Sequence, residues 1–158
     1  IFCIEEVILR EFQRGMKIWG TCAGAILCAN SIVGEPPYLG LIDIEIERNS
    51  FGSQLDSFTC EADILPVASR PIPLTFIRAP KIIRVGNGVN VLLRMNDYIA
   101  AAESPHVLVT VFHPELTGFL AWHRYFAVKC GLNPSMDKQK FFNNQWKTSN
   151  LMKYSRIA

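Results

Sequence analysis

Apolar residues recur along the chain with two different spacings, and the change of spacing separates expected helices from expected strands. Between residues 4 and 12 they follow the three-to-four-residue spacing of an amphipathic helix, which Gly15 would close. Residues 17–19 then predict a short apolar strand, and residues 25–29 predict an apolar helix. The first third of the chain therefore starts as helix, strand, tight turn and helix.

The middle of the chain carries short strand-like segments separated by turns. They are expected at residues 42–47, 58–64, 74–78, 82–85, 89–94, 98–102 and 107–112. Residues 86–88 and 95–97 predict hairpin turns. The segment 107–112 is apolar at all but one position, which is typical of a central strand buried on both faces. A second helix is expected at about 119–130, ended by Gly131.

This order of elements predicts an α/β fold with a β-rich middle. Only one helix precedes the strand at 17–19, whereas parallel sheets of this type usually have strands before that point, so the chain is expected to be N-terminally truncated. Residues 1–131 are expected to form one partial domain. Residues 132–158 are expected to be a polar, mildly basic tail without a predicted element.

Composition narrows the class of protein. The 158 residues are 49% hydrophobic and 19% charged, which is typical of a globular domain. The net charge of +2 is too small to favour nucleic acid or an anionic membrane as a partner. The apolar runs are far shorter than the ~20 residues of a membrane helix. The cysteines are odd in number and scattered without a C-x-x-C pair, which argues against a zinc site and a disulfide framework and favours a reducing, cytoplasmic compartment.

A cysteine stands at the centre of the turn between the strand at 17–19 and the helix at 25–29. The sequence G-T-C-A-G around Cys22 has the G-x-nucleophile-x-G form of a nucleophile elbow. The N-terminus of the following helix would favour a thiolate on Cys22, and the backbone N–H of Ala23 would be one oxyanion donor. The motif is short, so a glycine-bounded turn that happens to hold a cysteine is an equal alternative at this point.

A histidine and a glutamate follow the C-terminal end of the strand at 107–112, where catalytic groups of open α/β sheets gather. A cysteine nucleophile needs a base, and that base needs an orienting group. His113 can accept the proton of Cys22 while Glu115 accepts a hydrogen bond from the other imidazole nitrogen. Taken singly, they are equally explained as a loop histidine and an acid at a helix start. Their pairing with an elbow cysteine favours a Cys-His-Glu triad.

These motifs together resemble a known family. G-T-C-A-G with F-H-P-E-L far downstream is similar to the class I, or triad, glutamine amidotransferases. Within that class, four stretches resemble the glutaminase subunit of pyridoxal 5'-phosphate synthase. They are G-L-I-D-I-E-I-E-R-N-S-F-G-S-Q-L-D-S-F (40–58), F-I-R-A-P (76–80), F-H-P-E-L-T (112–117) and H-R-Y-F (123–126). The resemblance covers about residues 17–128.

The resemblance implies a three-layer sandwich with a mixed, mainly parallel, flavodoxin-like sheet. It also implies an enzyme that hydrolyses L-glutamine to glutamate and ammonia without a metal or cofactor of its own. The ammonia would pass to a separate (β/α)8-barrel synthase subunit, which builds pyridoxal 5'-phosphate (vitamin B6). Cys22 would attack the side-chain amide and form a γ-glutamyl thioester. His113 would act as general base and then general acid, oriented by Glu115.

The resemblance also implies substrate contacts. Arg48, in E-R-N, and the pair Ile77 and Arg78, in F-I-R-A-P, match family positions that contact glutamine. Arginine is suited to hold an α-carboxylate through paired hydrogen bonds. On sequence position alone, surface ion pairs would explain both arginines, and the motif matches reverse that preference.

Two departures from the family pattern bear on activity. The family has a glycine-rich P-G-G-E-S-like loop upstream of the cysteine, which supplies the other oxyanion donor, and residues 1–21 contain none. Loss of one such donor costs on the order of 10²–10³ in rate in a protease. In addition, Ser53 replaces the arginine of bacterial relatives.

Three functions are therefore compared. The first is a glutaminase subunit that works with a synthase partner. The second is a triad amidotransferase for another acceptor, against which E-R-N-S-F-G-S-Q argues. The third is a truncated, inactive chain or a module that only binds the barrel subunit.

Overall fold

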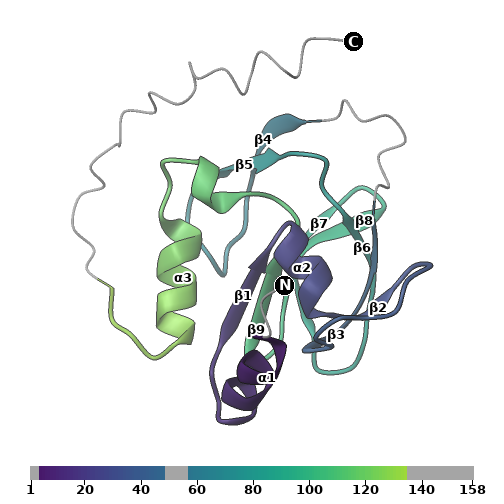
Figure 1. Ribbon diagram of the computed structural model, residues 1–158. Coiled ribbons are helices and arrows are strands. Elements are labelled where there is room, and N and C mark those ends of the chain that lie inside the picture. The colour runs from purple at the N-terminus through teal and green to yellow at the C-terminus, as the bar shows by residue number, and fades with distance from the viewer. Residues whose placement is uncertain (1–3, 49–56, 135–158) are drawn as a thin grey trace.

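The computed structural model describes residues 4–48 and 57–134, which form a sheet with helices packed against it (Figure 1). The described helices are α1 (Glu5–Gln13), α2 (Ala23–Cys28), α3 (Ala121–Lys129) and a 3-10 turn, η1 (Pro114–Leu116). The described strands are β1 (Ile18–Thr21), β2 (Ala29–Ile32), β3 (Ile42–Glu47), β4 (Phe58–Ala62), β5 (Ile72–Phe76), β6 (Lys81–Val85), β7 (Asn90–Met95), β8 (Tyr98–Glu103) and β9 (Val107–Thr110). Ser53 and most of the tail lie outside the described residues.

The main sheet has the strand order β1-β9-β8-β6-β3-β2, with β7 paired to β8, and β4 and β5 form a separate two-stranded sheet. Strands β1 and β9 run parallel, as do β2 and β3. The other pairs of the main sheet are antiparallel. The expected mixed sheet is confirmed, but its parallel share among the described strands is smaller than expected. Two of the antiparallel pairs, β7–β8 and β8–β9, are joined by short turns, and strands joined by such turns run antiparallel.

Strand β1 shows that helices cover both faces of the sheet. Adjacent residues of a strand point to opposite faces. Trp19 contacts His123 and Phe126 of α3, with ring centroids 5.2 and 5.6 Å apart. The neighbouring Gly20 lies so close to α2 that an added Cβ would stand 2.5 Å from the carbonyl oxygen of Gly24. Helices α2 and α3 therefore form the two outer layers, on either side of β1 in Figure 1, and the three-layer sandwich is confirmed.

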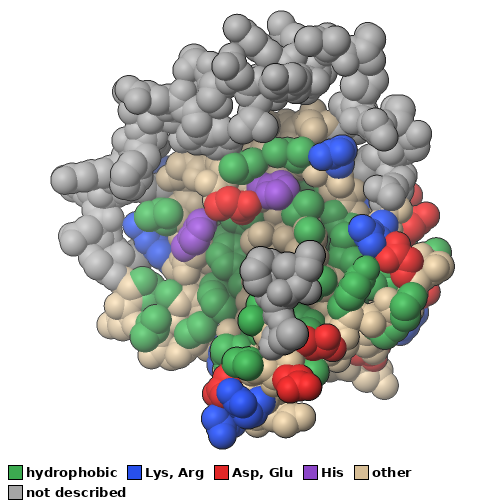
Figure 2. Space-filling model, viewed as in Figure 1, with side chains coloured by type: hydrophobic (Ala, Val, Ile, Leu, Met, Phe, Trp, Pro, Cys, Tyr) green, Lys and Arg blue, Asp and Glu red, His purple; other side chains and the backbone are tan. Residues whose placement is uncertain are grey.

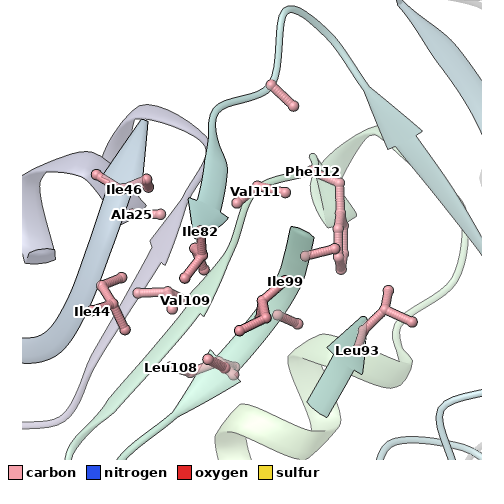
Figure 3. Packing of buried hydrophobic residues seen from close by; sticks show 14 of the residues in the cluster. Ala25, Ile44, Ile46, Ile82, Leu93, Ile99, Leu108, Val109, Val111 and Phe112 are labelled. Atoms are coloured by element: carbon pink, nitrogen blue, oxygen red, sulfur yellow. The ribbon is translucent and has the colours of Figure 1, made fainter. Parts of the chain in front are cut away.

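The core lies on both faces of β9, the strand predicted to be buried on both. All four of its residues are fully buried. On the α2 side, Val109 packs near Ala25 and Ile44 (Figure 3). On the α3 side, Phe112, just beyond the strand, contacts Trp122 at 5.3 Å between ring centroids. The expected central strand is thus confirmed, and it carries the candidate histidine at its end.

The expected turns and strands are partly corrected. The turn at 95–97 joins β7 and β8 as a hairpin, with Asn96 at φ 48°. The expected hairpin at 86–88 is wrong, because β6 pairs with β3 and β8 and not with β7. Strand β2 was not expected, since it follows α2 without a turn residue between them. None of the described helices is long and apolar enough to cross a membrane.

Candidate active site

Cys22 sits at the junction of β1 and α2 in a strained backbone conformation. Its φ of 46° and ψ of −107° lie where non-glycine residues are rare, and such outliers concentrate at functional sites. Its N–H donates to the Thr110 carbonyl of β9 at 2.8 Å, and its carbonyl accepts from the Ala25 N–H at 3.0 Å. The expected strand, turn and helix are confirmed, and hydrogen bonds to β9 and α2 hold the cysteine in place.

Only one of the two glycines of the motif is required by packing. A side chain at Gly20 would meet the backbone of Gly24 and Ala25, whereas a side chain at Gly24 would have nothing within 4 Å among the described residues. Gly20 therefore permits the close approach of β1 and α2. The N–H groups in the first turn of a helix have no intrahelical acceptor, so the N–H of Ala23 points out of α2 next to Cys22.

His113 follows β9 and is fixed by its backbone and its ring. Its N–H donates to the Thr75 carbonyl at 2.8 Å, which ties it to the end of β5. Its Nδ1 lies 2.7 Å from Oε1 of Glu115, and interaction with the side chain of Cys22 raises the pKa of the ring. Since Nδ1 is engaged by Glu115, Nε2 is the nitrogen that remains for Cys22. The predicted triad residues are thus brought together.

The neighbours of His113 change its ionisation. The hydrogen bond with Cys22 raises the pKa of His113 most strongly, burial lowers it, and the hydrogen bond with Glu115 raises it, so that it reaches about 9 instead of 6.5. A charged imidazolium beside a thiolate is the arrangement that activates cysteine nucleophiles.

A pocket of about 460 Å³ lies in front of Cys22. It is lined by Cys22, Ala23, Ile26, Arg48, Ile77, Arg78, Pro80 and His113. Every predicted site residue is in this set except Glu115, which lies behind the imidazole. Sequence reasoning missed Ile26 and Pro80. Two features of the sequence could have identified them. Ile26 lies one helical turn after the cysteine, and Pro80 ends the segment F-I-R-A-P.

The two arginines of the pocket are held in different ways. Arg78 follows β5 with φ 44°, a second strained residue at the same pocket. Nη1 of Arg48 lies 2.8 Å from Oε2 of Glu35, and this hydrogen bond raises the pKa of the guanidinium. Among the described residues, no three His, Cys, Asp or Glu side chains are grouped so that they could hold a metal ion. The pocket thus offers a thiol, an imidazole and two cations, a set suited to a small anionic substrate with an electrophilic carbonyl.

Comparison with known proteins identifies the family of the chain. Residues 4–131 match the model of the SNO glutamine amidotransferase family. The chain belongs to this family. The family match spans the elbow, the pocket arginines and the F-H-P-E-L segment, so the site lies inside the family domain.

Two proteins described as pyridoxal 5'-phosphate synthase subunits are similar to the chain in sequence. "Pyridoxal 5'-phosphate synthase subunit PdxT" of Syntrophus aciditrophicus (strain SB) is 63% identical over 132 residues, which are 84% of this chain and 59% of that protein. The protein with the same description from Clostridium botulinum (strain Loch Maree / Type A3) is 47% identical over 129 residues, which are 81% of this chain and 67% of that protein.

A solved structure described as "Crystal structure of glutamine amidotransferase" has the same fold. It superposes with a TM-score of 0.75 at 39% sequence identity and covers 82% of this chain and 69% of that chain. The chain thus spans about three-fifths of the length of the S. aciditrophicus protein and about two-thirds of the others named here.

Proposed function

We propose that the chain hydrolyses L-glutamine to glutamate and ammonia through a triad of Cys22, His113 and Glu115. One observation carries the proposal: the thiol, the imidazole and both predicted arginines line a single pocket, with the carboxylate of Glu115 behind the imidazole. Free glutamine has a side-chain amide for the thiolate and an α-carboxylate for an arginine. Both parts of the substrate therefore find their chemical counterparts in one cavity.

In the proposed mechanism, the imidazole takes the thiol proton and Sγ of Cys22 attacks the side-chain carbonyl carbon. The N–H of Ala23 stabilises the oxyanion that forms. His113 then gives its proton to the nitrogen as the C–N bond breaks, so ammonia leaves and a γ-glutamyl thioester is left. A water that His113 deprotonates attacks the thioester, releases glutamate and restores the thiol. Glu115 keeps the imidazole in the required orientation throughout.

Arg48, Ile77 and Arg78 are the proposed substrate contacts. The arginines lie within the pocket on two different segments, one after β3 and one after β5. An arginine pairs with a carboxylate through two parallel hydrogen bonds, which fixes the direction of the substrate as well as its affinity. Ile77, which is partly exposed in the pocket, would contact the methylene groups of glutamine.

We also propose that the ammonia passes to a (β/α)8-barrel pyridoxal 5'-phosphate synthase subunit in the cytoplasm. Support comes from relatives described as subunits of that synthase. These relatives weigh against another acceptor pathway. The proposed division is an amidotransferase domain at residues 1–131, followed by a tail at 132–158, and the family match to residue 131 supports that boundary.

The test is ammonia release from L-glutamine, measured for the chain with and without the barrel subunit. We expect release that the partner stimulates and that Cys22→Ala abolishes. Cys130→Ala is the matched control and should keep the activity, because this exposed thiol lies at the end of α3 and does not line the pocket.

Two outcomes would decide against the proposal. Equal release from the chain and from Cys22→Ala would remove Cys22 as the nucleophile. No release from either, with binding to the barrel subunit intact, would leave the chain as a binding module only.

A further inference from the structure

The pocket arginine Arg48 is held from outside the pocket by an acidic side chain. Its Nη1 donates to Oε2 of Glu35 at 2.8 Å, and the Tyr38 hydroxyl donates to the same oxygen at 3.4 Å. Arg48 lines the cavity, whereas Glu35 and Tyr38 do not. Glu35 therefore acts on the side chain of Arg48 from behind and leaves the space in front of it to a ligand.

The segment that carries Glu35 is anchored to the same elements as the catalytic residues. The N–H of Leu39 donates to the Leu27 carbonyl at 3.0 Å, and the N–H of Leu41 donates to the Cys28 carbonyl at 2.8 Å. These bonds tie residues 33–40 to the end of α2, the helix that begins next to Cys22. Helix α2 therefore fixes the position of Glu35 relative to Cys22, and the ion pair with Glu35 fixes Arg48 in turn.

At the other side, the same segment is fixed to β3. The N–H of Val33 donates to the Ile46 carbonyl at 3.0 Å. The backbone of Glu35 forms an isolated antiparallel β-bridge with Ile32, the last residue of β2. Arg48 comes directly after β3. Glu35 and Arg48 therefore lie on two backbone segments that hydrogen bonds hold in place. The ion pair between them then fixes the long side chain of Arg48.

The chemistry of arginine allows one guanidinium to serve two carboxylates. It has five N–H donors in a planar fork, and the contact with Glu35 uses Nη1. Donors on the other side of the fork are then available to a second carboxylate. A fixed guanidinium loses less side-chain freedom when it binds than a mobile one does.

We propose that Glu35, supported by Tyr38, is a positioning residue that aims Arg48 at the α-carboxylate of the substrate and so favours substrates with a free α-carboxylate. This inference rests on the proposed glutaminase function. Glu35 does not touch the reacting atoms, so it should affect substrate affinity and not the chemical step.

The experiment compares Glu35→Ala with Glu35→Gln in steady-state glutaminase assays, under the conditions in which the wild type releases ammonia. Gln retains an oxygen that accepts from Arg48, whereas Ala retains none. We expect Glu35→Ala to raise KM for L-glutamine about three- to fivefold, because both side chains are about 40% exposed and such pairs are weak. Glu35→Gln should stay within about twofold of the wild type, and kcat should change little in either variant.

Two controls separate positioning from a general structural effect. Glu45 on β3 is a comparable acid: it pairs with Arg84 at 3.3 Å and does not line the pocket. Glu45→Ala should therefore leave KM unchanged. The second control is L-glutamine α-amide, which lacks the carboxylate. With this substrate, the wild type and Glu35→Ala should have the same KM.

The outcomes are distinct. An unchanged or lower KM in Glu35→Ala would overturn the inference, since a lower KM means that Glu35 competes with the substrate for Arg48. A rise of the same size with the α-amide would overturn it too. If the wild type itself neither binds L-glutamine in calorimetry nor releases ammonia, then the proposed function fails, and this inference fails with it.

Discussion

At the scale of the residue, the ionisation of His113 depends on its two partners. The hydrogen bond with Cys22 raises its pKa most, burial acts in the opposite direction, and Glu115 adds a smaller rise, giving a value of about 9. We therefore predict that Cys22→Ala lowers the pKa of His113 more than Glu115→Gln does. NMR chemical shifts of the imidazole, followed from about pH 5 to about pH 10, measure both changes.

The control for this titration is His123, which stacks edge-on against Trp19. Burial lowers its pKa, and the charge of Glu115 partly opposes that effect. His123 should therefore respond to Glu115→Gln with a further decrease and should not respond to Cys22→Ala. A wild-type His113 that titrates near its ordinary value of 6.5 would contradict the prediction.

The same ionisation has a consequence for stability, because the folded state binds the proton of His113 more tightly than the unfolded state does. The stabilisation is fully present below about pH 6.5 and is lost as the pH rises through about 9. The difference in free energy of unfolding between the wild type and His113→Gln should shrink across this window. Urea denaturation at several pH values measures it.

At the scale of the element, the contact between β1 and α2 sets the position of Cys22, the proposed nucleophile. In Gly20→Ala the new Cβ would meet backbone atoms, the nearest 2.5 Å away, so α2 must move. We predict a loss of roughly 1–3 kcal/mol in the free energy of unfolding, as in other overpacked sites, together with a large loss of glutaminase activity because Cys22 moves with α2. Thermal unfolding and ammonia release measure the two effects.

Gly24→Ala is the matched control, since it adds the same methyl group four residues further on. Nothing among the described residues lies within 4 Å of the new Cβ, and alanine is favoured over glycine in a helix. The variant should be as stable as the wild type or slightly more stable. Equal destabilisation by both substitutions would mean that the elbow itself, and not the strand–helix contact, requires glycine.

The elements also show what local sequence can predict. Helix α1 and strands β3 and β9 were predicted within a few residues, because their apolar spacing or length is distinctive. The hairpin at 86–88 was predicted wrongly, because local turn residues do not reveal that β6 pairs with β3 and β8. Glycine is needed at position 20 and not at 24 because the backbone of α2 packs against position 20. Such a contact belongs to the tertiary structure and cannot be predicted from local sequence.

At the scale of the whole molecule, the site is assembled from segments that are far apart in the sequence. The motifs predicted which residues belong together, and the structure places all but Glu115 of them on one pocket. The proposed role of Glu35 was not predicted, because it depends on a loop that folds back against α2. On the face shown in Figure 2, acidic and basic side chains are interspersed and do not form one large basic patch.

A row of aromatic rings joins the two sheets and α3 behind this site. Phe58 stacks on Phe76 at 4.5 Å, Phe76 contacts Phe112 at 5.5 Å, and Phe112 contacts Trp122 at 5.3 Å. Phe112 directly precedes His113, so the row supports the position of His113 as well as the core. Trp122 is 1% exposed, and its indole N–H has no hydrogen-bond partner among the described residues. Its contribution to stability therefore comes from packing alone.

We predict that Trp122→Ala lowers the free energy of unfolding by about 3–5 kcal/mol, since it leaves a large cavity between α3 and the sheet. Trp122→Phe should cost much less, because it keeps an aromatic ring and removes the unpaired buried N–H. Leu132→Ala, at a side chain that is 64% exposed, should change stability by less than about 0.5 kcal/mol. Chemical denaturation measures the three values, and ammonia release should fall in Trp122→Ala because Phe112 loses its support beside His113. If Trp122→Ala unfolds like Trp122→Phe, then α3 does not share the core that holds His113.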